Sequence, residues 1–163
     1  MSKRVTLLGL TLAAAMLLSY VETLIPPLSS VPGIKIGLAN IAVIFALYRL
    51  EIKNAFLVSM VRVILSAMLF GNIVGFAYSA VGALLSLIVM VSLKRTGNFS
   101  IYGVSIAGGV AHNVGQIAAA VFIIGSGSIA YYLPVLIISG TIAGAVIGIV
   151  SGIIIKRLEK YCI

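Results

Sequence analysis

Six apolar segments, separated by short polar breaks, constrain the fold of this chain more than any other feature. A membrane-spanning helix needs about 20 apolar residues, so 163 residues hold at most about six or seven spans. Only 9% of the residues are charged and the mean hydropathy is +1.28, whereas about a quarter of a soluble domain is charged. We therefore predict an all-α membrane protein, a bundle of six transmembrane helices that forms a single integral membrane domain over 1–163. The helices are expected at 5–25, 36–48, 55–70, 73–93, 101–124 and 132–155.

Two of these segments are short for the thickness of a bilayer. The segment 36–48 is too short for a perpendicular span and 55–70 is marginal, so either is expected to be a partial or broken helix inside the bundle. The break between the first two segments contains Pro26, Pro27 and Pro32, which a helix cannot continue through. We predict that 26–35 is an ordered lid that ends with Lys35 beside a pocket. A tight turn is expected at 71–72 and a small flexible loop at 125–128.

The distribution of positive charge orients the bundle. Nine of the eleven cations lie at alternate ends of the six segments, which places them on one side of the membrane. The positive-inside rule then predicts a multi-pass protein of the plasma membrane with both termini in the cytoplasm. The first segment is expected to be a retained helix rather than a signal peptide, because no small-residue cleavage site follows it. The nine cations are Lys3, Arg4, Arg49, Lys53, Lys94, Arg95, Lys156, Arg157 and Lys160.

The scarcity of carboxylates excludes several kinds of enzyme. The chain has no Asp, and its Glu residues are Glu22, Glu51 and Glu159. Aspartate-rich binding of Mg²⁺-diphosphate and paired-carboxylate catalysis both need more acidic groups than this. The lone Cys162 excludes an intrachain disulfide, and no nucleotide-binding or hydrolase motif occurs. We expect no enzymatic activity, no catalytic residue, no cofactor and no metal, and the placement of the cations argues against nucleic acid.

Arg62 is the first candidate site residue, because it lies near the middle of a predicted span. A charge at that depth costs several kcal/mol and usually faces a cavity or a partner. On a helix, Arg62 shares a small polar face with Ala55, Ser59 and Ser66. The structural alternative is an arginine that ties helices together through carbonyl groups or through Glu22.

The fifth segment carries a second polar group, composed of His112, Asn113 and Gln116. His112 and Gln116 are one helical turn apart and can contact the same ligand group. We predict that these side chains line a cavity, and that His112 and Arg62 share it. The alternative is hydrogen bonding between helices, worth about 0.6–2 kcal/mol per bond. Glu22, near the outer end of the first segment, shares a face with Thr11, Ala15 and Ser19 and is either an interface group or a carboxylate partner.

Small residues at intervals of four predict close helix packing. The last segment has glycines at four such positions, and Gly9 and Ala13 repeat the spacing in the first segment. This pattern lets helix backbones approach closely, within the chain or with a partner helix. The four glycines are Gly140, Gly144, Gly148 and Gly152.

Several short stretches together are similar to the Gx transporter family, whose members are also described as heptaprenyl diphosphate synthase component I. They are PGIKIGLANI at 32–41, RVIL at 62–65, FGN at 70–72, GVAHNVGQ at 109–116 and YYLP at 131–134. The family in turn resembles the S components of energy-coupling factor transporters. This resemblance implies six helices, a substrate pocket that opens outward and a long first loop able to cover it. S components often carry AxxxA on the first helix to meet the coupling subunit, and Gly9 and Ala13 stand at the nearest equivalent here.

Two functional hypotheses follow. The favoured one is an S-component-like transport protein that captures a small molecule or amphiphile from the outer side, with an anionic or isoprenoid-linked group. The energy for transport would come from a coupling module or an ion gradient. The alternative is a non-catalytic membrane subunit of polyprenyl diphosphate or quinone metabolism, which would recruit a soluble prenyl synthase, and a weaker third hypothesis is a purely structural membrane partner. The proposed pocket residues are Lys35, Asn40, Arg62, His112, Asn113, Gln116 and Glu22.

Overall fold

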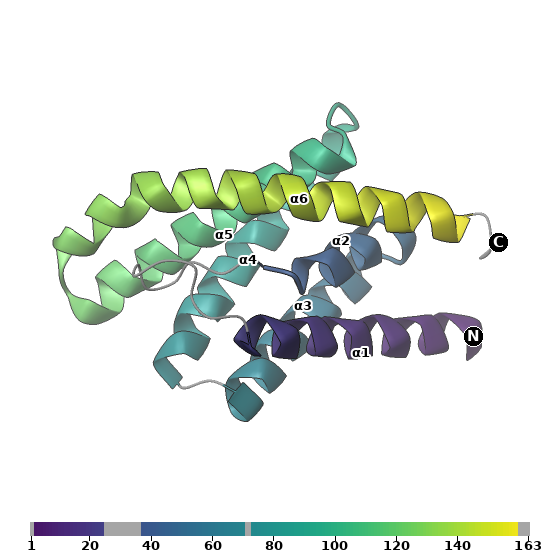
Figure 1. Ribbon diagram of the computed structural model, residues 1–163, viewed down its shortest axis with the longest axis horizontal. Coiled ribbons are helices and arrows are strands. Elements are labelled where there is room, and N and C mark those ends of the chain that lie inside the picture. The colour runs from purple at the N-terminus through teal and green to yellow at the C-terminus, as the bar shows by residue number, and fades with distance from the viewer. Residues whose placement is uncertain (1, 25–36, 71–72, 160–163) are drawn as a thin grey trace.

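The computed structural model describes residues 2–24, 37–70 and 73–159, and it is helical throughout these ranges apart from short connections (Figure 1). Within them lie six α-helices and one 3-10 helix, η1, and no strand. The bounds are α1 (Ser2–Leu24), α2 (Asn40–Arg49), α3 (Ile52–Phe70), α4 (Ile73–Thr96), α5 (Ile101–Ile124), η1 (Gly127–Tyr132) and α6 (Leu133–Glu159). The predicted lid at 26–35 and the predicted turn at 71–72 fall outside the described residues.

Five of the helices are long and apolar enough to cross a membrane: α1, α3, α4, α5 and α6. Their outward faces carry large apolar side chains, for example Met68, Ile73 and Phe122, which are 77%, 86% and 89% exposed. Lipid is the solvent that such faces require, since water would leave this apolar surface unfavourably hydrated. The predicted all-α membrane fold with six helices is confirmed.

The short helix α2 forms the centre of the bundle. Its ten residues extend about 15 Å, half of the ~30 Å hydrocarbon core. Six consecutive residues, Ala42 to Leu47, are buried, so α2 is apolar on every side and needs neighbours on every side. It contacts α1, α3 and α6 and lies between α1 and α6 in Figure 1. The expected short second helix is confirmed, whereas α3, which was expected to be marginal, is an unbroken helix of 19 residues.

The helices form two groups joined through α2 and the α3–α4 contact. In one group, α5 packs against both α4 and α6, and in the other, α1 packs against α3 and α2. The beginning of α1 and the end of α6 lie at the same end of the molecule (Figure 1). At that end the ammonium group of Lys94 donates a hydrogen bond to the carbonyl of Leu47 and lies 5.0 Å from the centre of the Tyr48 ring. This bond satisfies a carbonyl in the last turn of α2.

The ends of α5 follow local sequence signals. Ser100 caps the first turn, because its hydroxyl accepts a hydrogen bond from the N–H of Gly103 at 3.2 Å. Gly125 ends the helix with φ +70°, a left-handed conformation that glycine adopts without a steric penalty. The predicted extent of the flexible loop, 125–128, is wrong. The chain enters the 3-10 helix η1 at Gly127 and passes from it directly into α6.

Candidate functional site

Arg62 of α3 and Glu22 of α1 lie near enough for their opposite charges to interact. Arg62 lies near the middle of α3 on the inward face that also carries the buried Ala55 and Ser59. The Arg62 side chain is half-buried and interacts electrostatically with the carboxylate of Glu22. Its Nε atom is buried and has no hydrogen-bond partner among the described residues. The pair therefore brings a guanidinium with an unused donor into the interior of the bundle.

Glu22 also holds the chain that leads into α2. Its carboxylate accepts a hydrogen bond from the backbone N–H of Gly37. Gly37 has φ +74°, and its carbonyl accepts a hydrogen bond from the N–H of Asn40 at 2.8 Å. A Cβ atom at position 37 would lie 3.4 Å from both Asn40 Nδ2 and Ile147 Cδ1, so Asn40 and α6 adjoin this turn. One carboxylate thus links Arg62 to the beginning of α2.

Two serines extend this group along the α1–α3 contact. Ser19 lies one turn before Glu22 on α1, and Ser66 lies one turn after Arg62 on α3. Both hydroxyl oxygens are buried and have no hydrogen-bond partner among the described residues. Ser19, Glu22, Arg62 and Ser66 are called the α1–α3 polar cluster below. Buried polar groups normally have partners, so these unused hydroxyls, together with Arg62 Nε, are a set of donors available to a ligand.

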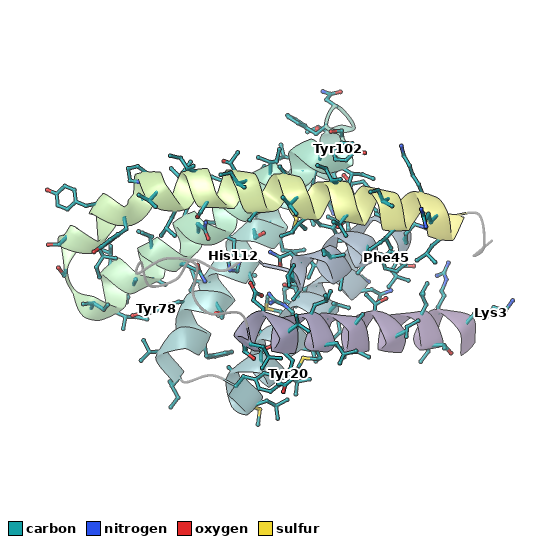
Figure 2. The ribbon with its side chains drawn as sticks, viewed as in Figure 1. Lys3, Tyr20, Phe45, Tyr78, Tyr102 and His112 are labelled. Atoms are coloured by element: carbon teal, nitrogen blue, oxygen red, sulfur yellow. The ribbon has the colours of Figure 1, made fainter. Side chains whose placement is uncertain are left out.

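The three polar residues of α5 divide between two neighbouring helices. His112 and Gln116 face α4 at Gly82, where an added Cβ would lie 2.8 Å from the His112 carbonyl oxygen and 2.9 Å from Gln116 Cγ. Asn113 faces α6, and its Nδ2 donates a hydrogen bond to the carbonyl of Leu136 at 2.6 Å. The amide of Asn113 therefore joins α5 to α6. Figure 2 shows His112 well inside the bundle.

A cavity of about 210 Å³ lies where η1 joins α5 to α6. Its lining is almost wholly apolar, and the polar groups on it come from one amide and two phenols. None of the described lining residues belongs to α1 or α3, so the α1–α3 polar cluster and this cavity are separate features. That Arg62 and His112 line one cavity stays a prediction. The lining residues are Tyr78, Gln116, Ile117, Ala120, Ile124, Ile129, Tyr132 and Leu136.

The glycine series of α6 packs against α5. An added Cβ at Gly140 would lie 2.9 Å from the Gly109 carbonyl oxygen, and one at Gly144 would lie 2.7 Å from Ile106 Cα. Further along, Gly148 and Gly152 pack against Tyr102. By contrast, Gly9 and Ala13 are exposed on α1, and an added Cβ at Gly9 would meet nothing within 4 Å. That face of α1 is open to lipid or to a partner helix.

Of the eight lining residues, sequence reasoning predicted only Gln116 as a pocket residue, and it missed the two tyrosines, Tyr78 and Tyr132. It also missed the backbone N–H of Gly37 as a partner of Glu22. Tyr78 lies one turn before Gly82 on α4, a spacing that marks a shared face but not which helix covers it. The predicted pocket residue Lys35 falls outside the described residues. Among the residues that the structure describes, no group of three or more His, Cys, Asp or Glu side chains is placed to hold a metal ion.

Comparison with known proteins gives one match. A family model described as heptaprenyl diphosphate synthase component I matches residues 11–154. This range includes every described residue of the α1–α3 polar cluster and of the cavity. Searches of curated proteins and of solved structures gave no match.

Proposed function

Because the chain belongs to the heptaprenyl diphosphate synthase component I family, we propose that it is a membrane-embedded binding protein for a small molecule or amphiphile with an anionic group. The family ties this membrane protein to a synthase of prenyl diphosphates, and a prenyl diphosphate is an amphiphile of that kind. The absence of Asp from the sequence supports a non-catalytic role, since metal-diphosphate chemistry draws on clustered carboxylates.

The observation that carries the proposal is Arg62 inside the bundle, with a buried Nε that has no hydrogen-bond partner among the described residues and with the opposite charge of Glu22 nearby. An arginine at this depth costs several kcal/mol unless a partner compensates its charge. The nearby charge of Glu22 offsets part of this cost, and an anionic ligand group would take over that role when bound. The unused donors of Arg62 Nε, Ser19 and Ser66 would then hydrogen-bond to the ligand oxygens.

The position of Glu22 favours exchange with the outer side. Glu22 lies in the last turn of α1, whereas Lys3 and Arg4 lie in the first turn. The cation-rich end of the bundle is cytoplasmic by the positive-inside rule. A ligand that reaches Glu22 and Arg62 by the shorter path therefore enters from the opposite side. Movement across the membrane would draw on a partner module or an ion gradient, in line with the resemblance to S components.

Identification of the bound molecule tests the proposal. The protein is extracted in a mild detergent, and small molecules that stay bound are identified by mass spectrometry. The wild-type protein should carry an anionic molecule, and Arg62→Gln should carry about 10- to 150-fold less, the equivalent of a hydrogen bond to a charged group worth about 1.5–3 kcal/mol. Arg95→Gln is the matched control, because Arg95 is exposed at the end of α4. Equal loading of the two variants would contradict the proposal.

A second candidate is an accessory subunit that brings a soluble prenyl synthase to the membrane. The family description favours it, since it names a component of a synthase. The cations at the ends of α1, α4 and α6 would provide the docking face. A soluble synthase that co-purifies equally with the wild type and with Arg62→Gln, while no small molecule is bound, would favour this candidate over the first.

A further inference from the structure

The cavity beside η1 differs in chemistry from the α1–α3 polar cluster. Its eight described lining residues include no charged side chain, and α4, α5, η1 and α6 supply all of them. The cluster, in contrast, carries Arg62 and Glu22 between α1 and α3. A ligand group that suits one of these sites would therefore be disfavoured in the other, because a charge in an apolar cavity is costly.

The size of the cavity limits what it can hold. An apolar protein cavity of about 150 Å³ accommodates benzene. The cavity of about 210 Å³ is therefore large enough for a somewhat larger group, on the order of five to ten carbon atoms. A full heptaprenyl chain, with seven five-carbon units, is far too large for it.

Gln116 gives the cavity one buried polar group. The residue is only 8% exposed, and it lines the cavity. Its Cγ packs close to Gly82, where the missing side chain makes room for it. An amide offers both a donor and an acceptor, and therefore suits a neutral hydroxyl or carbonyl group. Tyr78 and Tyr132, whose side chains carry neutral hydroxyl groups, also line the cavity.

We propose that this cavity is a second binding site, for a neutral amphiphile with an apolar chain of five to ten carbons and one hydroxyl group that Gln116 hydrogen-bonds. Short prenyl alcohols have this chemistry. The site goes beyond the proposed function, because it needs neither Arg62 nor an anionic ligand. Each CH₂ group that enters the cavity should raise the affinity about fourfold until the cavity is full.

The test is equilibrium dialysis of radiolabelled geraniol, a ten-carbon prenyl alcohol, against the protein in lipid nanodiscs, with empty nanodiscs to subtract partitioning into lipid. Saturable binding is expected for the wild-type protein. Ala120→Phe fills the cavity and should weaken binding at least tenfold. The matched control is Ala118→Phe, two residues away on the exposed face of α5, which should bind as the wild type does. If Ala120→Phe does not fold, Ile129→Trp fills the cavity from η1 instead and should weaken binding in the same way.

Two further measurements separate this site from the α1–α3 polar cluster. Gln116→Leu should reduce the preference for geraniol over the hydrocarbon 2,6-dimethyloctane by about two- to twelvefold, the equivalent of one neutral hydrogen bond. Arg62→Gln should leave geraniol binding unchanged. Equal binding by Ala120→Phe and Ala118→Phe, or no saturable binding at all, would overturn the proposal. Geraniol binding that Arg62→Gln weakens as much as Ala120→Phe does would also overturn it, because the cavity would then belong to the anionic site.

Discussion

Adding one methyl group at Gly144 should destabilise the protein, because this glycine lies where α6 crosses α5. The new Cβ would lie 2.7 Å from Ile106 Cα and 2.8 Å from the Ser105 carbonyl oxygen, and neither backbone atom can move without its helix. Separating the helices would also weaken the hydrogen bond from the Ser105 hydroxyl to the Gly144 carbonyl, which is 2.6 Å long.

Three contributions determine how much Gly144→Ala should change the free energy of unfolding. Overpacking costs about 1–3 kcal/mol, and the hydrogen bond between helices contributes about 0.6–1.7 kcal/mol. In the opposite direction, replacing glycine by alanine inside a helix stabilises that helix by about 0.8–1.0 kcal/mol. Gly144→Ala should therefore lower the free energy of unfolding by roughly 1–4 kcal/mol.

Gly9→Ala is the matched control for this experiment. Gly9 is also inside a helix, but an added Cβ would meet nothing within 4 Å, so only the gain in helix propensity applies. The assay is reversible unfolding in mixed micelles with increasing sodium dodecyl sulfate, followed by circular dichroism. Gly9→Ala should be equal to or slightly more stable than the wild type. Equal stability of Gly144→Ala and Gly9→Ala would refute the close contact between α5 and α6.

Three further predictions use the same logic of matched pairs or native probes. Asn113→Ala should lower the free energy of unfolding by about 0.6–1.7 kcal/mol through loss of its bond to α6, whereas the exposed Asn98→Ala should be neutral. Lys94→Met should cost about 1.5–3 kcal/mol, because it removes a charged donor from the last turn of α2. The exposed Lys53→Met should cost little in the same unfolding assay. Cys162 should resist a membrane-impermeant maleimide in intact cells, and its labelling would contradict a cytoplasmic C-terminus.

The helices themselves were predictable from the sequence. A helix that crosses the bilayer needs a run of about 20 apolar residues, and the hydropathy of the sequence measures such runs directly. The expected segment 101–124 matches α5, whose ends are marked by Ser100 and Gly125. The short second segment was also recognisable, since a segment of 13 residues cannot cross a core about 30 Å thick. The extension of α6 to Glu159 was missed because its last turn carries charged residues that lower the hydropathy.

The candidate site was predictable in part. The inward face of α3 was visible in the spacing of Ser59 and Arg62, because small and polar residues turn away from lipid. Which helix meets which was not visible. Asn113 and Gln116 are three residues apart and share a broad face, yet one meets α6 and the other meets α4. Such assignments depend on the order of helices around the bundle, which periodicity does not encode.

The most direct test of the central claim compares Arg62→Gln with Glu22→Gln in one assay, the equilibrium binding of farnesyl diphosphate to the protein in lipid nanodiscs. If an anionic ligand replaces Glu22 as the partner of Arg62, the two substitutions should change the binding affinity in opposite directions. Arg62→Gln should weaken binding about 10- to 150-fold. Glu22→Gln should strengthen it, because the amide oxygen can still accept the Gly37 N–H bond while the competing negative charge is gone. Equal affinities for the two variants and the wild type, with both variants folded, would contradict the account.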